Sequence, residues 1–237
     1  MHNKLIYCST NTRTMKKKEI MYLALLLILL ISCSKKEIKV AVVGDSITEG
    51  YGLSDRSKNA YPVMLDSILG SYYSVLNCGQ SSSTVQKKGD VPYWTRGEFY
   101  NVFAYKPEII IIALGTNDVR PRMDGIQGTN WNEVNFSKDY QAMIDTFNTI
   151  NTKPKIFLCL PTPIYKNPFN WNDGDSALIA SIIPAVRKIA EKNGLPVIDL
   201  YTQMSNQPEN FLDGIHPNER GTRIIGEFIS KAIKDNN

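Results

Sequence analysis

Three polar segments of this 237-residue chain carry side chains that could act together in catalysis. The first contains Ser46, the second Asn117, and the third Asp213 and His216. A serine hydroxyl becomes an effective nucleophile when a neighbouring base takes its proton, and a carboxylate behind the base fixes its tautomer. An amide donor can stabilise the negative charge that develops on an attacked carbonyl oxygen. These residue types therefore indicate ester hydrolysis by a serine nucleophile.

Histidine is scarce in this chain, which narrows the choice of base. Only His2 and His216 occur, and His2 lies upstream of a candidate export signal, so His216 is the one histidine expected in the mature protein. Asp213 precedes it by three residues, a spacing that lets the carboxylate reach the imidazole within one turn. Each motif alone also suits a turn or a helix cap. Their joint occurrence is what favours catalysis.

The amino-terminal segment has the composition of an export signal. Three lysines at 16–18 precede an apolar run at 20–31, which is shorter than the ~20 residues of an ordinary membrane span. The run closes with Leu-Ile-Ser-Cys at 30–33, which resembles a bacterial lipobox. We therefore expect residues 1–33 to form a leader with Cys33 as the lipidation site. A plain signal peptide, or a free thiol at Cys33, is the alternative.

This leader predicts an exported bacterial lipoprotein, anchored to a membrane in the periplasm or at the cell surface. It also accounts for the basic balance of the chain. The sequence has 27 Lys and Arg against 23 Asp and Glu, but residues 1–32 hold five and one of these, which leaves 22 of each. A net charge of zero gives no reason to expect a nucleic-acid partner.

Five short apolar runs predict strands that are buried on both faces: Ile38–Val43, Tyr73–Leu76, Ile109–Leu114, Ile156–Leu160 and Val197–Leu200. Amphipathic patterns between them predict helices over Tyr61–Leu69, Ser137–Ile150, Ala177–Lys192 and Glu219–Ile233. Ser137 is a plausible N-cap, and Gly194 a helix stop. The alternation predicts a three-layer α/β/α sandwich with a five-stranded parallel sheet, as a single domain over residues 38–237 after a polar tether at 34–37.

The candidate catalytic segments fall where this fold would place a site. Ser46 follows the first predicted strand and Asn117 the third, and open α/β sheets bind ligands beyond the carboxyl ends of their strands. Two long segments, Gln86–Arg96 and Val119–Val134, also follow predicted strands and are candidates for binding substrate. Cys78 and Cys159 end strands that need not be neighbours, so free buried thiols are expected, although an exported chain could pair them.

The mature chain resembles the SGNH, or GDSL-type, hydrolases. GDSIT at 44–48, GTND at 115–118 and DGIHPN at 213–218 match three blocks of that family. The resemblance implies a flavodoxin-like fold, with Ser46 as the nucleophile, His216 as the base and Asp213 as its orienting carboxylate. It also implies an oxyanion hole made by the side-chain amide of Asn117 and the backbone N–H of Ser46. It implies no cofactor and no metal.

The remaining block departs from the family pattern. The family usually has a glycine five residues after an asparagine at the end of the second strand, whereas Ser82 stands five residues after Asn77 here. A backbone N–H is the expected oxyanion donor at this position, and serine retains it. The backbone geometry would differ if the position needs a positive φ. Gly79 is the alternative donor, although the spacing favours Ser82.

Further local features resemble a sialate O-acetylesterase-like subgroup. Trp94 and Trp131 could stack on a sugar, or pack their own loops; Arg120 and Arg122 could bind a sugar carboxylate, or be solvated. These features favour a metal-independent esterase, monomeric by default, that removes O-acetyl groups from a carbohydrate such as sialic acid. An exported lysophospholipase or thioesterase is one alternative. A sugar-binding lipoprotein with an impaired site is another.

Overall fold

The computed structural model describes residues 16–18, 22, 36–121, 128–169, 171 and 173–236. Cys33, nearly all of the predicted leader and Arg122 lie outside the described residues. The chain divides into two compact units, Met1–Lys36 and Glu37–Asn237, and the elements below belong to the second. Within the described ranges, we find no helix with the length and apolar character that a membrane span requires.

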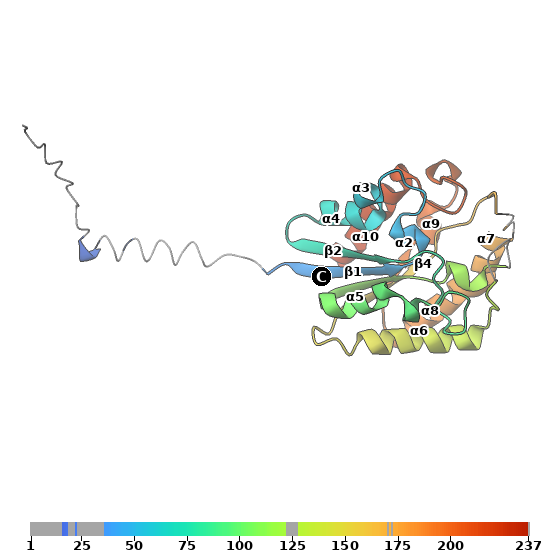
Figure 1. Ribbon diagram of the computed structural model, residues 1–237, viewed down its shortest axis with the longest axis horizontal. Helices are drawn as coiled ribbons and strands as arrows, with labels where there is room; N and C mark the ends of the chain where they lie inside the picture. Colours follow the sequence, from blue (N-terminus) through green and yellow to red (C-terminus); the bar gives the residue numbers. More distant parts are fainter. Residues whose placement is uncertain are drawn as a thin grey trace, which may run out of the picture. The chain divides into compact units, whose positions relative to one another are not determined.

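Five strands among the described residues form one parallel sheet in the order β2-β1-β3-β4-β5 (Figure 1). Their bounds are β1 Ile38–Gly44, β2 Tyr73–Gly79, β3 Ile109–Ala113, β4 Lys155–Leu160 and β5 Val197–Asp199. Gly44 at the end of β1 is in register with Gly79 of β2 and Ala113 of β3. The segments that follow these three strands therefore leave the same edge of the sheet side by side.

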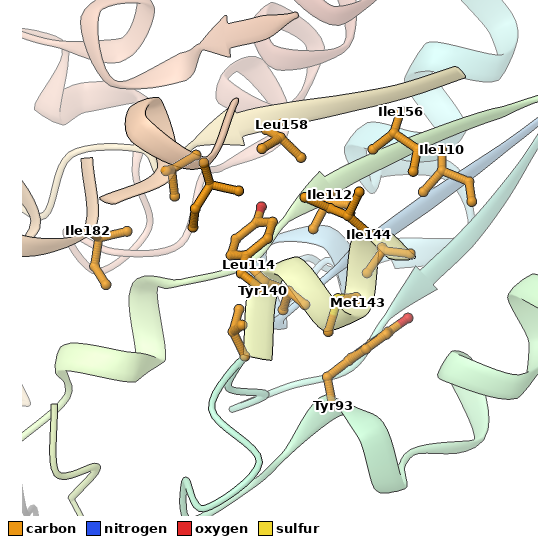
Figure 2. Close-up of a cluster of buried hydrophobic side chains, with 14 of the residues drawn as sticks. Tyr93, Ile110, Ile112, Leu114, Tyr140, Met143, Ile144, Ile156, Leu158 and Ile182 are labelled. Atoms are coloured by element: carbon orange, nitrogen blue, oxygen red, sulfur yellow. The ribbon is translucent and has the colours of Figure 1, made fainter. Parts of the chain in front are cut away.

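Helices cover both faces of this sheet (Figure 1). One face carries α5 (Gly97–Tyr105), α6 (Glu133–Phe147) and α8 (Ile183–Asn193); the other carries α4 (Tyr61–Leu69), α9 (Leu200–Met204) and α10 (Glu219–Asp235). Strand side chains alternate between the two cores, so Ala41 and Val43 of β1 enter the first and Val40 and Val42 the second. Figure 2 shows the first core, in which Tyr140 and Met143 of α6 lie beneath Ile110 and Ile112. The predicted α/β/α architecture is confirmed.

Several predicted boundaries were wrong. Strand β2 runs three residues further than the apolar run, because Asn77 and Gly79 still pair with β1. Helix α6 begins after Asn132, whose side chain accepts the N–H of Asn135, and Ser137 lies inside the helix. The helix predicted over 177–192 is three consecutive helical segments: α7 (Gly174–Ala177), a π-helical turn (Leu178–Ile182) and α8. Its stop was right, since Gly194 caps α8 in the left-handed conformation. Helix α5 was not predicted.

Both described cysteines of this unit are buried and free. Cys78 ends β2 and Cys159 lies in β4, and strands β1 and β3 separate them in the sheet. The expectation of two free thiols is confirmed for the described residues.

Candidate active site

The serine of the first segment begins a helix at the carboxyl end of β1. Helix α2 (Ser46–Glu49) is capped by Asp45, whose Oδ1 accepts the N–H of Ile47 at 3.0 Å. First-turn N–H groups have no acceptor inside their own helix, and within the described part of the chain the N–H of Ser46 donates to no protein atom. Ser46 therefore presents a hydroxyl and an unused N–H at the edge of the sheet.

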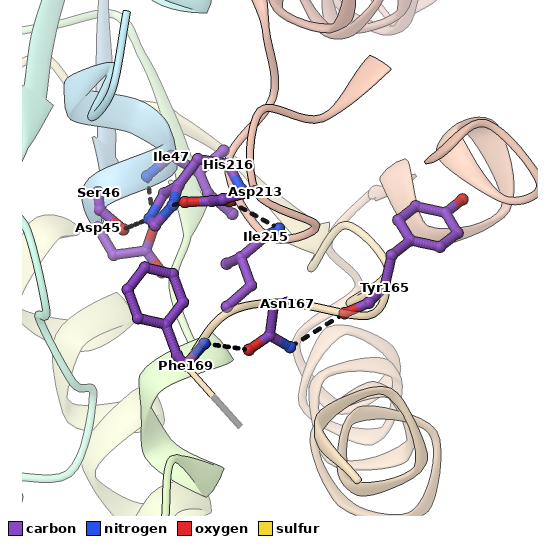
Figure 3. A network of polar contacts seen from close by, with 9 residues as sticks. All are labelled: Asp45, Ser46, Ile47, Tyr165, Asn167, Phe169, Asp213, Ile215 and His216. Atoms are coloured by element: carbon purple, nitrogen blue, oxygen red, sulfur yellow. Dashed lines mark hydrogen bonds and ion pairs between the residues drawn. The ribbon is translucent and has the colours of Figure 1, made fainter. Parts of the chain in front are cut away.

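The structure brings Ser46, His216 and Asp213 into one hydrogen-bonded chain (Figure 3). Ser46 Oγ lies 3.0 Å from His216 Nε2, although 170 residues separate the two positions. On the other side of the ring, His216 Nδ1 lies 2.7 Å from Asp213 Oδ2. If Nδ1 carries the proton and donates it to Asp213, Nε2 is an acceptor for the serine hydroxyl. The geometry is that of a nucleophile, a base and an orienting carboxylate.

The carboxylate of Asp213 also organises its own turn. Its Oδ1 accepts the backbone N–H groups of Ile215 at 3.0 Å and His216 at 2.8 Å, while Oδ2 faces the ring. Burial raises the pKa of Asp213, but the hydrogen bonds from the ring and backbone of His216 and from Ile215 outweigh it, and the net pKa is below the ordinary value. Asp213 therefore stays charged, as an orienting group requires.

Asn117 comes from the turn after β3. It lies in the 3₁₀ segment η2 (Thr116–Val119), and its side chain is buried and borders the same cavity as Ser46. Its amide nitrogen lies 3.3 Å from Asp45 Oδ2 and 3.3 Å from the carbonyl of Ser83. Both contacts are long for N–H···O bonds, so these hydrogens remain able to donate to a better acceptor.

Ser82 comes from the turn after β2 and also lines the cavity. Its φ is +64°, in the left-handed region that glycine adopts most readily. Its N–H has no acceptor among the residues that the structure describes, whereas the N–H of Gly79 donates to Asn77 Oδ1 at 2.8 Å. Ser82, and not Gly79, is therefore the residue with a backbone donor available at the site.

Arg120 matches neither of the two predictions made for it, a ligand of a sugar carboxylate or a solvated side chain. It is buried rather than solvated, and its guanidinium forms an ion pair with Asp90 and donates to Asn117 Oδ1 at 2.8 Å. Asp90 therefore neutralises the charge that was expected to bind a sugar carboxylate. Arg120 does border the cavity, beside Asn117.

A cavity of about 260 Å³ opens over these groups. Its polar lining includes Ser46, His216, Ser82, Asn117 and Arg120. Its apolar and aromatic lining consists of Tyr51, Phe169, Trp171, Ile47 and Ile215. The ring centroid of Tyr51 lies 4.7 Å from that of His216, and Phe169 approaches the same ring edge-on at 6.5 Å. Across the described residues, no group of three His, Cys, Asp or Glu side chains is arranged to hold a metal ion.

The two tryptophans predicted to bind substrate are not among the residues that line this cavity. The indole of Trp94 donates to the carbonyl of Val85 at 2.9 Å and carries the ammonium of Lys87 over its ring. Trp131 packs on Phe136 of α6. Both tryptophans pack their own loops instead.

The aromatic side chains that do reach the cavity were not predicted from the sequence. Phe169 and Trp171 lie in the segment between β4 and α7, where Asn167 Oδ1 accepts both of their N–H groups (Figure 3 shows the bond to Phe169). Tyr51 follows α2. The available signal was position, since the long segment after Leu160 also leaves the carboxyl edge of the sheet.

Comparisons with known proteins agree with this arrangement. The model of the GDSL-like Lipase/Acylhydrolase family matches residues 42–224. An acetylxylan esterase from Xylanibacter ruminicola is 37% identical over 216 residues, which cover 83% of this chain and 43% of that protein. The chain thus spans less than half of the length of this relative.

Solved structures show the same fold. An acetyl xylan esterase matches with a TM-score of 0.65 at 24% identity, over 83% of this chain and 100% of its own. A carbohydrate acetylesterase from Sinorhizobium meliloti matches with a TM-score of 0.65 at 18% identity, over 85% and 100%. At these identities the likeness shows the fold alone.

Proposed function

Because the chain belongs to the GDSL-like Lipase/Acylhydrolase family, we propose that it is a serine esterase that removes O-acetyl groups from a carbohydrate. The observation that carries the reaction is the chain of contacts from Ser46 Oγ to His216 and on to Asp213, at 3.0 and 2.7 Å. The acetyl group and the carbohydrate are supported by the acetylxylan esterase that is 37% identical to this chain.

The contacts suggest a two-step reaction. His216 Nε2 takes the proton of Ser46 as Oγ attacks the acetyl carbonyl, and Asp213 stabilises the resulting imidazolium. The oxyanion is received by the N–H groups of Ser46 and Ser82 and by the amide of Asn117. As the tetrahedral intermediate collapses, His216 protonates the departing sugar oxygen, so the sugar leaves with a free hydroxyl and the acetyl group stays on Ser46. A water molecule, activated by His216 in the same way, then releases acetate from Ser46.

The cavity offers exposed aromatic rings to a sugar. Tyr51 and Phe169 line it and are exposed, so a sugar face could stack on either ring. The sequence resemblance to sialate O-acetylesterases keeps sialic acid as a candidate sugar. The pairing of Arg120 with Asp90 instead favours a sugar without a carboxylate.

Hydrolysis of p-nitrophenyl acetate tests the reaction. Ser46→Ala is expected to abolish release of p-nitrophenol while leaving the circular-dichroism spectrum and unfolding midpoint unchanged. Full activity in this variant would overturn the mechanism. Activity that rises from acetyl to octanoyl esters would favour the lysophospholipase or thioesterase alternative. Acetate release from a panel of acetylated xylan fragments and O-acetylated sialic acids would identify the sugar.

We further propose that the protein is an exported lipoprotein held to a membrane by Cys33. The basic, apolar and Ser-Cys composition of residues 16–33 supports this. In a bacterial host, Cys33→Ser is expected to abolish metabolic labelling with a fatty acid and to move the esterase out of the membrane fraction. Equal labelling of the variant and the parent would contradict the proposal.

A further inference from the structure

We propose that Arg120, held in place by Asp90, is a positioning residue that keeps the amide nitrogen of Asn117 directed at the site of the oxyanion. The inference rests on the proposed function, because that function gives Asn117 its role. It deepens that function by tying the amide to two loops outside the family blocks identified in the sequence.

The ion pair behind Asn117 is almost completely enclosed. The side chains of Arg120 and Asp90 are 3% and 9% exposed. Asp90 Oδ2 accepts from Arg120, and Oδ1 accepts from Thr129 Oγ1 at 2.8 Å. A buried ion pair is weak evidence for stability, because desolvation offsets much of the attraction between the charges. A role in orienting a neighbouring group is a better reason for an enclosed pair at this position.

The chemistry of the guanidinium fixes the direction of the amide. Arginine has five N–H donors and no acceptor, so the atom of Asn117 that faces it must be the carbonyl oxygen. Arg120 Nη1 lies 2.8 Å from Asn117 Oδ1. The nitrogen of the amide is consequently on the opposite side, near Asp45 Oδ2 and the carbonyl of Ser83. A flipped amide would place N–H donors against N–H donors.

The same bond strengthens the donor at the other end of the amide. A charged donor on a carbonyl oxygen makes a stronger hydrogen bond than a neutral one, and linked hydrogen bonds polarise one another. Asp90 lies between β2 and α5 and Thr129 between β3 and α6, so the bond between them joins these two segments beside Arg120.

A double-mutant cycle distinguishes loss of the positioning of Asn117 from a general loss of structure at the site. Asp90→Asn combined with Arg120→Met removes both charges together, so neither is left buried alone. With p-nitrophenyl acetate we expect kcat to fall roughly 10- to 100-fold, which is part of the loss of one oxyanion donor, with KM changed less than about threefold. In an Asn117→Ala background the same pair of substitutions is expected to cause no further loss. Equal losses in both backgrounds, or no loss when Asn117 is present, would overturn the proposal.

A conservative variant and a surface control accompany this test. Arg120→Lys keeps the charge beside Asp90 but lacks the second nitrogen that reaches Asn117, so kcat should fall while folding is retained; wild-type kcat would count against the proposal. Arg187→Met with Asp199→Asn removes an ion pair of 2.7 Å at the surface and serves as the matched control, with kcat unchanged.

Nuclear magnetic resonance provides a readout that does not depend on turnover. The side-chain amide resonances of Asn117 are identified as the pair missing from Asn117→Ala. They should shift in the Asp90→Asn, Arg120→Met protein and stay in place in the surface control. Absence of esterase activity from the wild type would refute the proposed function, and these resonances would still decide the positioning role. Unchanged resonances would refute the positioning role whatever the activity.

Discussion

At the scale of single residues, Ser82 is the position that the sequence marked as unusual for the expected oxyanion hole. It has a left-handed backbone, with a φ of +64°, and it follows Ser81, whose N–H and hydroxyl both bind Glu49 Oε2. Glu49 lies in α2, the helix that Ser46 begins. The carboxylate therefore ties the Ser82 turn to the helix of the nucleophile and helps to hold a conformation that serine adopts at a cost.

Replacing Ser82 tests whether only its backbone matters. Ser82→Gly should leave kcat within about threefold. It should raise the free energy of unfolding by up to ~1 kcal/mol, because the relief of backbone strain in the folded state outweighs the added freedom of the unfolded chain. Urea unfolding and p-nitrophenyl acetate kinetics provide the measurements. Ser82→Ala is the matched control, since it removes the hydroxyl and keeps the strain. A large loss of kcat in both variants would show that the hydroxyl takes part.

The sequence allowed this residue to be singled out, but it did not settle its geometry. The spacing from Asn77 gave the position, and the type of residue raised the question of a positive φ. The answer depends on contacts with Glu49 and on the use of the N–H of Gly79 by Asn77. Both are tertiary facts that local propensity does not contain.

At the scale of elements, the proposed catalytic and oxyanion groups come from four turns around one edge of the sheet. Three of them follow β1, β2 and β3, and the fourth, 211–217, precedes α10. Gly214 joins this fourth turn to the segment after β4. Its φ is +85°, its carbonyl accepts the N–H of Tyr165 at 2.7 Å, and a Cβ there would lie 2.3 Å from the carbonyl oxygen of Lys166.

A side chain at position 214 should therefore displace the histidine turn. Gly214→Ala is expected to lower the free energy of unfolding by at least ~1 kcal/mol and to lower kcat, because His216 moves relative to Ser46. Thermal unfolding and ester hydrolysis measure the two effects. Gly97→Ala is the control, since Gly97 begins α5 with no atom within 4 Å of its would-be Cβ. A Gly214→Ala protein with unchanged unfolding free energy and unchanged kcat would contradict the role given to this turn.

Elements with a strong apolar period were predictable, whereas those set by tertiary contacts were not. The strand runs placed all five strands, because side chains buried on both faces give a continuous apolar run. The predicted start of helix α6 was wrong, because Asn132 and not Ser137 caps it. Phe169 and Trp171 were missed because nothing in their local sequence shows that Asn167 folds them over the site. Trp94 and Trp131 were predicted from residue type, and neither lines the cavity.

At the scale of the whole molecule, the buried carboxyl group of Asp118 makes the stability of the fold depend on pH. Asp118 accepts the N–H groups of Val85 and Gln86, each at 2.9 Å, and so binds the loop after β2 to the turn after β3. Burial raises its pKa from 3.8 to about 7, against the lowering effect of those N–H groups. Between these values the folded protein retains a proton that the unfolded chain releases.

Stability should consequently fall as the pH rises through this window. The contribution of Asp118 is fully present below pH 3.8 and is lost as the pH rises to about 7. Asp118→Asn cannot ionise, so the difference in unfolding free energy between wild type and variant should shrink by roughly 2–4 kcal/mol from pH 4 to pH 7.5. Urea unfolding at several pH values measures it. A difference that stays constant with pH would contradict the assignment.

The proposed reaction requires that His216 activates Ser46. Intact-mass analysis after treatment with a fluorophosphonate tests this activation, because the reagent requires an activated serine and no knowledge of the substrate. We predict one adduct per molecule, mapped to Ser46, with none on Ser46→Ala and markedly slower labelling of His216→Ala. An unlabelled wild-type protein, or labelling that persists in Ser46→Ala, would contradict the activation of Ser46 by His216.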